Sequence, residues 1–290
     1  MIRPSTFSIV AFDPGLPAWG VAVASKFPAV GAVVPWAVAG AGAVATQALA
    51  NTTYGPRGLE LLSSGIPALE AIALMLSGDE ERDQRQVGMV DARGGSATYT
   101  GAACFEWAGG TSSEGVAVQG NILSGPGVVE EMYGAFRDSN ASFPDRLLEA
   151  LHAGEAAGGD RRGRQSAALL VVKPRGGYGG FNDRWLDYRV DDHSDPLTQL
   201  GHLVKLHELY FGESPAHDRL VIANSTAEAL QKIMARLGYY QGEINGSYDE
   251  SSREALRHFI GNENFEDRSD IEEGMIDRPV FEFLVEKFLE

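Results

Sequence analysis

Short apolar segments separated by Gly, Pro and Asp follow one another through the first two thirds of the chain. This punctuation is typical of strands. Four consecutive strands are predicted, over residues 6–12, 19–25, 30–37 and 43–48. Runs such as VAVAS and GAVVPWA are apolar at nearly every position, whereas a sheet with one face in water shows alternation. We therefore expect these strands to be covered on both faces.

Two helices are predicted next, over residues 56–64 and 67–76, because each segment has a proline near its first turn and a glycine just beyond its end. The remaining pattern predicts strands at 86–91, 96–99, 115–119, 166–173 and 185–189, and helices at 128–137 and 144–157. Consecutive strands without intervening helices exclude a Rossmann-type alternation. They favour an α+β fold with antiparallel sheets and segregated helices.

The composition of the chain changes near residue 212. Of 35 glycines, 29 lie in residues 1–211 and only 6 in residues 212–290. Residues 220–290 carry 15 acidic and 7 basic side chains, which is half of the net charge of −16 in about a quarter of the length. We expect two domains, 1–212 and 213–290. Leucines at helical spacing within residues 195–210 predict a connecting or docking helix.

Charge and cysteine content exclude several classes of function. A net charge of −16 disfavours binding to nucleic acid or to an anionic membrane surface. The single cysteine, Cys104, forms neither an intramolecular disulfide nor a Cys-x-x-Cys motif. No apolar run reaches the ~20 residues of a spanning helix, and the first apolar run is too short for a signal peptide. We expect a soluble, cytoplasmic protein.

Thr6, at the start of the first predicted strand, is a candidate nucleophile. A threonine at a mature amino terminus attacks an amide carbonyl with its own α-amine as the base, because that amine has a pKa near ~8. An internal peptide nitrogen has essentially no basicity. A threonine that opens a strand is, however, most often only structural.

Several long strings resemble the domain-of-unknown-function 1028 family: TFSIVAFDP, WGVAVASKFPAVGAVVPWA, GAVATQALANTTYGPRGLELL and GGDRRGRQSAALLVVKP, over about residues 6–212. That family is placed in the N-terminal-nucleophile hydrolase superfamily. The resemblance implies a four-layer α/β/β/α sandwich with antiparallel sheets, and it implies that the residue opening the first strand is the nucleophile.

Five residues precede Thr6, whereas members with this pattern tend to begin Met-Thr-Phe-Ser. While residues 1–5 remain attached, Thr6 has no free amine. Three alternatives are open: cleavage before Thr6, a true start downstream of the assigned one, or absence of the activity. Pro4 disfavours trimming by aminopeptidases, so cleavage requires autocatalysis at the Ser5–Thr6 bond.

Other polar residues are candidates for the same site. As the resemblance implies, the end of the second strand lies beside the nucleophile, and Ser25 and Lys26 occupy that end. Gln47 and Asn51 follow the fourth strand, where side-chain amides are suitable oxyanion donors. Asn121 ends another strand in a sharp break. Each of these residues is equally compatible with an ordinary turn, cap or surface role.

Asp160 and Arg161 lie in a glycine-rich loop and are candidates for binding the amine and the carboxylate of a substrate, or for a plain surface ion pair. The histidines are scattered, and His193 near three aspartates is a weak metal candidate. The glycine-rich strings lack a phosphate-loop lysine. No metal and no cofactor are therefore expected.

The acidic tail resembles the peptidoglycan-binding-like domain over about residues 227–259, with a leucine-rich helix, the string Leu-Gly-Tyr-Tyr, a glycine-containing turn and a helix that ends in Phe. A third helix over Arg278–Leu289 completes a predicted three-helix domain. Tyr239 and Tyr240 are candidates for stacking on a sugar ring, or for the core.

Two functions follow from these patterns. The first is an amidohydrolase in which Thr6 attacks a linear amide of a small peptide or of a cell-wall-derived fragment. The second is a non-catalytic binding or scaffold protein on the same fold, whose tail binds a peptidoglycan fragment or a protein. Neither requires a cofactor, and the apolar sheet domain and leucine-rich helix suggest a homo-oligomer.

Overall fold

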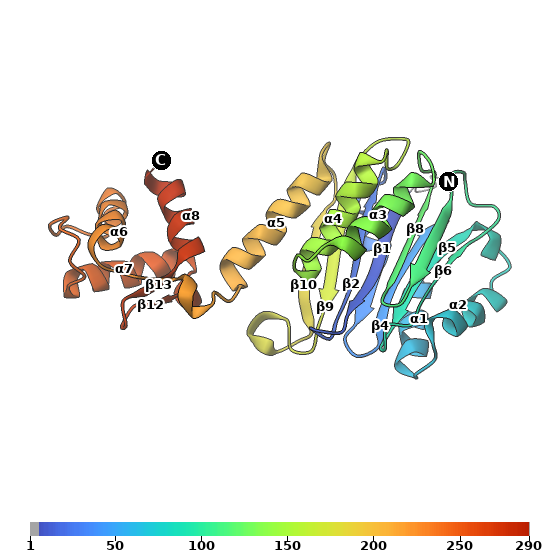
Figure 1. Ribbon diagram of the computed structural model, residues 1–290, viewed down its shortest axis with the longest axis horizontal. Helices are drawn as coiled ribbons and strands as arrows, with labels where there is room; N and C mark the ends of the chain where they lie inside the picture. Colours follow the sequence, from blue (N-terminus) through green and yellow to red (C-terminus); the bar gives the residue numbers. More distant parts are fainter. Residues whose placement is uncertain (1–5, 290) are drawn as a thin grey trace. The chain divides into compact units, whose positions relative to one another are not determined.

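The computed structural model describes residues 6–289. Its internal contacts divide the chain into two compact units, Met1–Val204 and Lys205–Glu290. Figure 1 shows the order of helices and strands along the chain. The described residues contain eight α-helices and antiparallel sheets, so the expected mixed class of helices and antiparallel strands is confirmed.

The first unit contains ten strands within its described residues. They are β1 (Thr6–Asp13), β2 (Ala18–Ser25), β3 (Pro35–Val38), β4 (Gly42–Ala48), β5 (Arg85–Asp91), β6 (Ser96–Thr100), β7 (Gly109–Ser113), β8 (Val116–Asn121), β9 (Ser166–Val172) and β10 (Arg184–Val190). Its helices are α1 (Tyr54–Ser63), α2 (Ala68–Ser77), α3 (Gly127–Asp138), α4 (Phe143–Ala156) and the start of α5 (Pro196–Phe211). Three short 3₁₀ turns are η1 (Val30–Ala32), η2 (Arg82–Gln84) and η3 (Tyr178–Gly180).

These strands form two antiparallel sheets, one in the order β10-β9-β2-β1-β8-β7 and one in the order β3-β4-β5-β6. β1 is therefore central, with β2 and β8 as its neighbours. Because successive side chains of a strand point to opposite faces, β1 supplies two different cores. Ile9 packs in a cluster with residues of α3 and α4, while Val10 packs with residues of the four-stranded sheet.

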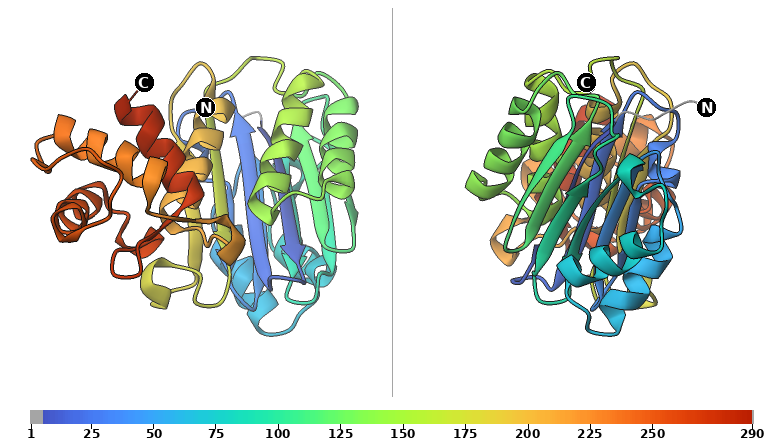
Figure 2. Two further views of the ribbon diagram at one scale, coloured as in Figure 1. Left: turned by 60° about the vertical axis from the view of Figure 1, so that its left-hand side comes forward. Right: turned by 90° about the vertical axis from the view of Figure 1, so that its right-hand side faces the viewer.

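A third cluster joins the four-stranded sheet to α1 and α2, through residues such as Val44, Leu62 and Met75. The two helix pairs lie on different sheets, as the turned views show (Figure 2). Every residue of β2 is buried, as expected for a strand covered on both faces.

One predicted strand was wrong in part, and one strand was missed. Residues 30–37 form the 3₁₀ turn η1 followed by β3, because Ala29 adopts φ 51° and the Val30 N–H bonds to the Ser166 hydroxyl rather than to a backbone carbonyl. Gly31 permits this turn to approach β9, where a Cβ would lie 2.6 Å from the Cβ of Ala168. β7 was not predicted, since Gly-Gly-Thr-Ser-Ser has no apolar side chain.

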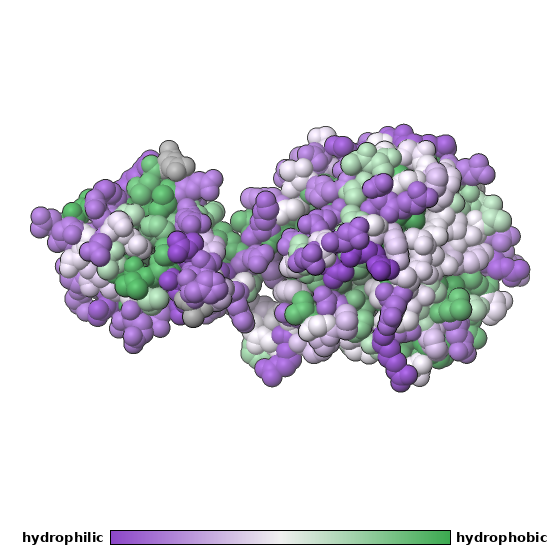
Figure 3. Space-filling model, in the orientation of Figure 1, coloured by the Kyte–Doolittle hydropathy of each residue, from purple (hydrophilic) through white to green (hydrophobic). Residues whose placement is uncertain are grey.

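The second unit has three helices after α5: α6 (Asn224–Arg236), α7 (Glu250–Glu263) and α8 (Arg278–Leu289). It also has a small antiparallel sheet that the sequence did not predict, formed by β11 (Arg219–Val221), β13 (Met275–Asp277) and β12 (Ser269–Asp270). Two 3₁₀ turns, η4 (Ala216–Asp218) and η5 (Glu266–Arg268), precede β11 and β12. Its core is built around Leu230, Phe259 and Leu284. Hydrophobic residues are also visible on α8 at the surface (Figure 3).

Arg268 joins this small sheet to the end of α5. Its side chain is 4% exposed, and its Nε donates to Asp277 Oδ2 at 2.7 Å. Its Nη1 donates to the carbonyls of Glu208 and Leu209, at 2.6 and 2.9 Å. The last carbonyls of a helix lack partners within the helix. The guanidinium therefore satisfies the Leu209 carbonyl, and it adds a second donor to the Glu208 carbonyl, which also accepts from the Gly212 N–H.

We predict that Arg268→Met destabilises the second unit by about 3 kcal/mol, because it removes the buried donor of Asp277 Oδ2 and of the Leu209 carbonyl. Arg257→Met is the matched control, since its ion pair with Glu272 is exposed, at 48% and 71%, and should cost less than about 1 kcal/mol. Urea unfolding of both variants measures the difference. Equal losses of unfolding free energy in the two variants would show that the buried contacts of Arg268 stabilise the unit no more than the exposed pair of Arg257 does.

Candidate functional site

Thr6 opens the central strand of the six-stranded sheet. In the strand register it is opposite Ser25 of β2 on one side and Asn121 of β8 on the other. Its hydroxyl lies 3.3 Å from the Ser25 hydroxyl, and its side chain is fully buried. The backbone of the first strand therefore brings together three of the residues that the sequence singled out.

Two side-chain amides of the four-stranded sheet, those of Gln47 and Gln86, lie next to the start of β1. Gln47 of β4 donates from Nε2 to the Thr6 carbonyl at 3.3 Å and to Gln86 Oε1 at 2.8 Å. The same Gln86 oxygen accepts from Asn121 Nδ2 at 2.9 Å. Gln86 Nε2 donates to the Gly120 carbonyl at 2.7 Å. A chain of amides thus links both sheets at the end of β1.

The network continues inward along β1 through Ser8. The Ser8 hydroxyl donates to Gln47 Oε1 at 2.6 Å and accepts from Gln119 Nε2 at 2.7 Å. All three side chains are fully buried. Gln119 Oε1 has no hydrogen-bond partner among residues 6–289. Such a concentration of buried polar groups is costly unless the groups bond to one another, which they do here almost completely.

Ser8, Gln86 and Gln119 were not among the predicted site residues. A signal was present, because Gln86 and Gln119 are amides next to apolar residues of buried strands. A polar side chain at an inward-facing position of a buried strand requires a partner. The missing information was which strands face each other across the two sheets.

Two predicted site residues point elsewhere. Lys26 is exposed and its Nζ donates to the Arg164 carbonyl at 3.2 Å. Asn51 Oδ1 accepts from the backbone N–H and the hydroxyl of Thr53, at 3.1 and 2.7 Å, which is an ordinary turn arrangement. Neither side chain has a described hydrogen bond to Thr6.

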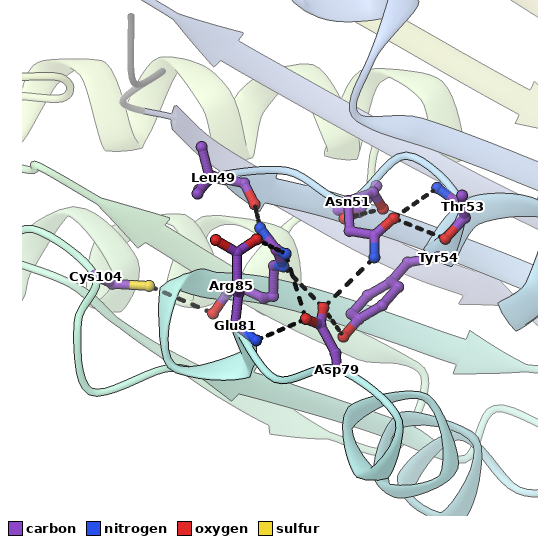
Figure 4. A network of polar contacts seen from close by, with 9 residues as sticks. Leu49, Asn51, Thr53, Tyr54, Asp79, Glu81, Arg85 and Cys104 are labelled. Atoms are coloured by element: carbon purple, nitrogen blue, oxygen red, sulfur yellow. Dashed lines mark hydrogen bonds and ion pairs between the residues drawn. The ribbon is translucent and has the colours of Figure 1, made fainter. Parts of the chain in front are cut away.

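Asp79 and Arg85 form a buried ion pair close to the end of β4 (Figure 4). Arg85 Nε donates to Asp79 Oδ2 at 2.8 Å, and Arg85 Nη1 donates to the Leu49 carbonyl at 2.7 Å. Tyr54 and Asn51 also donate to Asp79 Oδ2. The pair therefore fixes the loop that follows β4, and β4 carries Gln47.

This arrangement shifts two pKa values. The Arg85 guanidinium holds the pKa of Asp79 well below its usual range, against the effect of burial, with further help from the Tyr54 hydroxyl. Burial raises the pKa of Tyr54, and its hydrogen bond to the Asp79 carboxylate raises it further. Asp79 is therefore ionised and Tyr54 neutral throughout the ordinary pH range.

Asp160 has its carboxylate occupied by the protein itself. Its Oδ2 accepts from the Lys26 backbone N–H at 2.7 Å, and both oxygens accept from the Arg162 guanidinium. Arg161 is exposed, and its backbone N–H bonds to the Ile122 carbonyl. Asp160 is therefore buried and tethers its loop to the end of β2, whereas the side chain of Arg161 is exposed.

In the second unit, Tyr240 belongs to the core, and its hydroxyl donates to the Glu243 carbonyl at 3.0 Å. Tyr239 is half-buried, packs at a tilt against Phe259 and accepts from Asn262 Nδ2 at 2.6 Å. Of the two tyrosines, only Tyr239 has a substantial accessible surface.

Residues 6–289 contain no group of three or more acidic, histidine or cysteine side chains arranged to hold a metal ion. Within the same described residues, no helix is both long and apolar enough to cross a membrane.

Comparison with known proteins gives matches for both units. Residues 6–200 match a family described as "Family of unknown function (DUF1028)", and residues 210–284 match a family described as "Putative peptidoglycan binding domain". The crystal structure of protein SPO2555 from Silicibacter pomeroyi, described with the same DUF1028 family, is similar to this chain. It has 32% sequence identity and a TM-score of 0.65, with 70% of this chain and 89% of that chain covered. No curated protein matches significantly.

We predict that Asp79→Asn destabilises the first unit by about 3 kcal/mol, because the buried Arg85 loses its buried counter-ion and keeps only the exposed Glu81. Glu81→Gln is the matched control, since Glu81 binds the same guanidinium but is 59% exposed, and should cost less than about 1 kcal/mol. Chemical unfolding at pH 7 measures both values. Equal losses in the two variants would contradict the assigned role of Asp79.

The Asp79 carboxylate also makes the stability of the first unit depend on pH in the acidic range. Since the folded pKa of Asp79 is depressed, its stabilising effect is present above the unfolded pKa of about 4 and is lost as the pH falls below it. Asp79→Asn should therefore flatten the decline in stability on acidification from pH 5 downward. An unchanged slope in the variant would contradict the prediction.

Proposed function

The chain belongs to the family of unknown function DUF1028, and from this premise we propose that it is an amidohydrolase of the N-terminal-nucleophile type, with Thr6 as its nucleophile. The observation that carries the proposal is the position of Thr6. It opens the central strand of the sheet, with its hydroxyl against Ser25 and its carbonyl bonded by Gln47. A polar constellation at this strand end is what an N-terminal nucleophile requires.

We also assign the first unit to the four-layer α/β/β/α sandwich of that superfamily. Support comes from the packing of α3 and α4 on the six-stranded sheet and of α1 and α2 on the four-stranded sheet. Side chains of both sheets meet in a further cluster around Val21 and Ala45. In the second unit, α6, α7 and α8 are the proposed three-helix domain, with the small sheet added to it.

The chemistry requires a free amine on Thr6 and therefore cleavage of the Ser5–Thr6 bond. Residues 1–5 lie outside the described residues. For autocatalytic cleavage, Thr6 Oγ1 attacks the Ser5 carbonyl carbon, the amide becomes an ester, and water hydrolyses the ester. The released pentapeptide carries the new carboxylate, and Thr6 retains its hydroxyl and gains a free α-amine.

On a substrate, the Thr6 α-amine takes the hydroxyl proton while Oγ1 attacks the amide carbonyl carbon. Collapse of the tetrahedral intermediate breaks the C–N bond, and the leaving nitrogen receives that proton. An ester on Thr6 remains. Water then attacks the ester carbonyl and gives its proton to the α-amine, which returns it to Oγ1 as the carboxylic acid leaves.

The neighbouring side chains have distinct proposed roles. Ser25 orients the Thr6 hydroxyl through the 3.3 Å contact between their oxygens. Gln47 donates to the Thr6 carbonyl and to Gln86 Oε1, so its proposed role is to position the start of β1. Asn121, bonded to the same Gln86 oxygen, presents an oriented amide dipole beside Thr6 and stabilises developing negative charge.

The proposed substrate is a linear amide of a small peptide or of a cell-wall-derived fragment. Its motivation is the match of residues 210–284 to a peptidoglycan binding domain. We propose that the second unit binds such a fragment, with half-buried Tyr239 as its aromatic contact. Stacking of a sugar on an exposed ring face is a common use of tyrosine at binding surfaces.

A second candidate function is a non-catalytic binding protein on the same fold. The observation in its favour is the complete burial of the Thr6 side chain, which has an exposed fraction of 0%. A nucleophile must be reached by its substrate, so the first proposal requires that cleavage also opens access to Thr6. The two functions therefore differ in the state of the amino terminus.

We predict that the purified protein begins at Thr6 and reacts with a peptide epoxyketone, which forms a ring with both the hydroxyl and the free amine of an N-terminal threonine. Thr6→Ala should retain residues 1–5 and lose labelling completely, whereas Thr6→Ser should retain both processing and labelling. Intact-protein mass spectrometry measures both. A wild-type chain that keeps residues 1–5 and remains unlabelled would favour the binding protein.

A further inference from the structure

A cavity of about 270 Å³ lies where β1 begins and β2 ends, on the side of the sheet that faces α4. Phe7 and Ala24 contribute from the strands, and these two side chains belong to the core shared with the helices. The rest of the wall comes from the end of α4, from the loop that follows it and from the start of α5. The lining residues used below are Phe7, Ser25, Glu155, Asp160, Arg164 and Pro196.

Glu155 and Arg164 provide the charge available in this wall. They form an ion pair, with Glu155 14% and Arg164 52% exposed. Burial raises the pKa of Glu155, and the Arg164 guanidinium lowers it in opposition. The carboxylate is therefore held in a poorly solvated place, whereas its cationic partner extends into water. Such a partner can move outward without a large desolvation cost.

The third charged lining residue, Asp160, is not available to a ligand. Its carboxylate accepts from the Lys26 backbone N–H and from Arg162. The remaining wall is apolar or small, with the Phe7 ring, Pro196 and the glycines of the loop. Glu155 and Arg164 alone can therefore bind a charged ligand within this cavity, as far as the described residues show.

We propose that this cavity binds a small zwitterion, namely a free amino acid, with its ammonium group on Glu155 and its carboxylate on Arg164. Insertion of a zwitterion replaces one ion pair by two, and the charge inside the cavity stays at zero. A lone carboxylate would face Glu155 and leave a charge uncompensated at a poorly solvated site. A lone amine would pair with Glu155 but offer nothing to the Arg164 guanidinium, so it forms one ion pair where a zwitterion forms two.

The dimensions fit this class of ligand. The cavity volume of about 270 Å³ is at the lower end of ordinary ligand pockets, which begin near about 300 Å³. A single amino acid fits within such a space. Phe7 and Pro196 offer an apolar wall to its side chain.

The cavity is connected to the proposed nucleophile through one residue. Ser25 lines the cavity, and its hydroxyl lies 3.3 Å from the Thr6 hydroxyl. If the proposed function holds, the site would bind the amino-acid part of the amide substrate. Only this last step rests on the proposed function, because binding of a free amino acid requires no reaction at Thr6.

Isothermal titration with free L- and D-forms of alanine, leucine, lysine and glutamate tests the proposal. At least one should bind, and the N-acetyl and amide derivatives of that amino acid should bind at least about 10-fold more weakly, since each lacks one charge. Glu155→Gln and Arg164→Gln should each weaken binding by about 10-fold or more. Glu155→Gln keeps the side-chain length, Arg164→Gln shortens the side chain and removes its charge, and the melting temperatures of both variants without ligand report whether the fold is intact.

Arg162→Gln is the matched control, because Arg162 lies in the same loop but pairs with Asp160. It should leave amino-acid binding within about twofold of wild type. Absence of binding by all eight amino acids would overturn the proposal. Equal binding of the N-acetyl derivative, or full binding by folded Glu155→Gln, would do so too. Since the readout is binding, these outcomes are distinct from failed epoxyketone labelling, which tests the hydrolase.

Discussion

The buried amides between the two sheets impose the strictest constraint on this fold. Ser8, Gln47, Gln86 and Gln119 are all fully buried, and they bond to one another and to adjacent strands. A shift of one residue in any of their strands would turn these side chains to the opposite face and leave their partners unpaired. Packing adds a steric condition, because a Cβ on Gly88 would lie 2.0 Å from Gln119 Oε1. The network thus fixes the relative register of both sheets.

The ion pair of Asp79 and Arg85 extends this constraint to the adjoining loop. Gln47 is opposite Gln86 in the ladder of β4 and β5, and the next pair is Ala48 with Arg85. Consecutive rungs of one ladder therefore carry the amides behind Thr6 and the guanidinium that bonds to the Leu49 carbonyl. Displacement of Arg85 would be transmitted directly to Gln47. We regard Asp79 as a positioning residue for the proposed site.

Much of the fold was predictable from local sequence, because apolar runs and Gly/Pro boundaries report burial and chain reversal. β1, β2 and the pair α3 and α4 are clear examples. β7 was not predictable, since Gly109–Ser113 is a strand only through its pairing with β8. The site was predictable only where strand ends are adjacent in the sheet. Gln86 required knowledge of which strand lies across the interface, and Lys26 was misplaced because only the structure shows where its long side chain turns.

The alternation of side chains along β1 explains how one strand end serves two proposed sites. Thr6 shares the face of Ser8, whose hydroxyl donates to Gln47 between the sheets, whereas Phe7 points toward the helices and lines the cavity with Glu155. Adjacent residues of a strand necessarily face opposite sides. A substrate held in the cavity must therefore reach Thr6 around the end of the sheet rather than through it. Ser25, which contacts Thr6 and also borders the cavity, occupies that path. A side chain bulkier than Ser25 would obstruct this path between the two proposed sites.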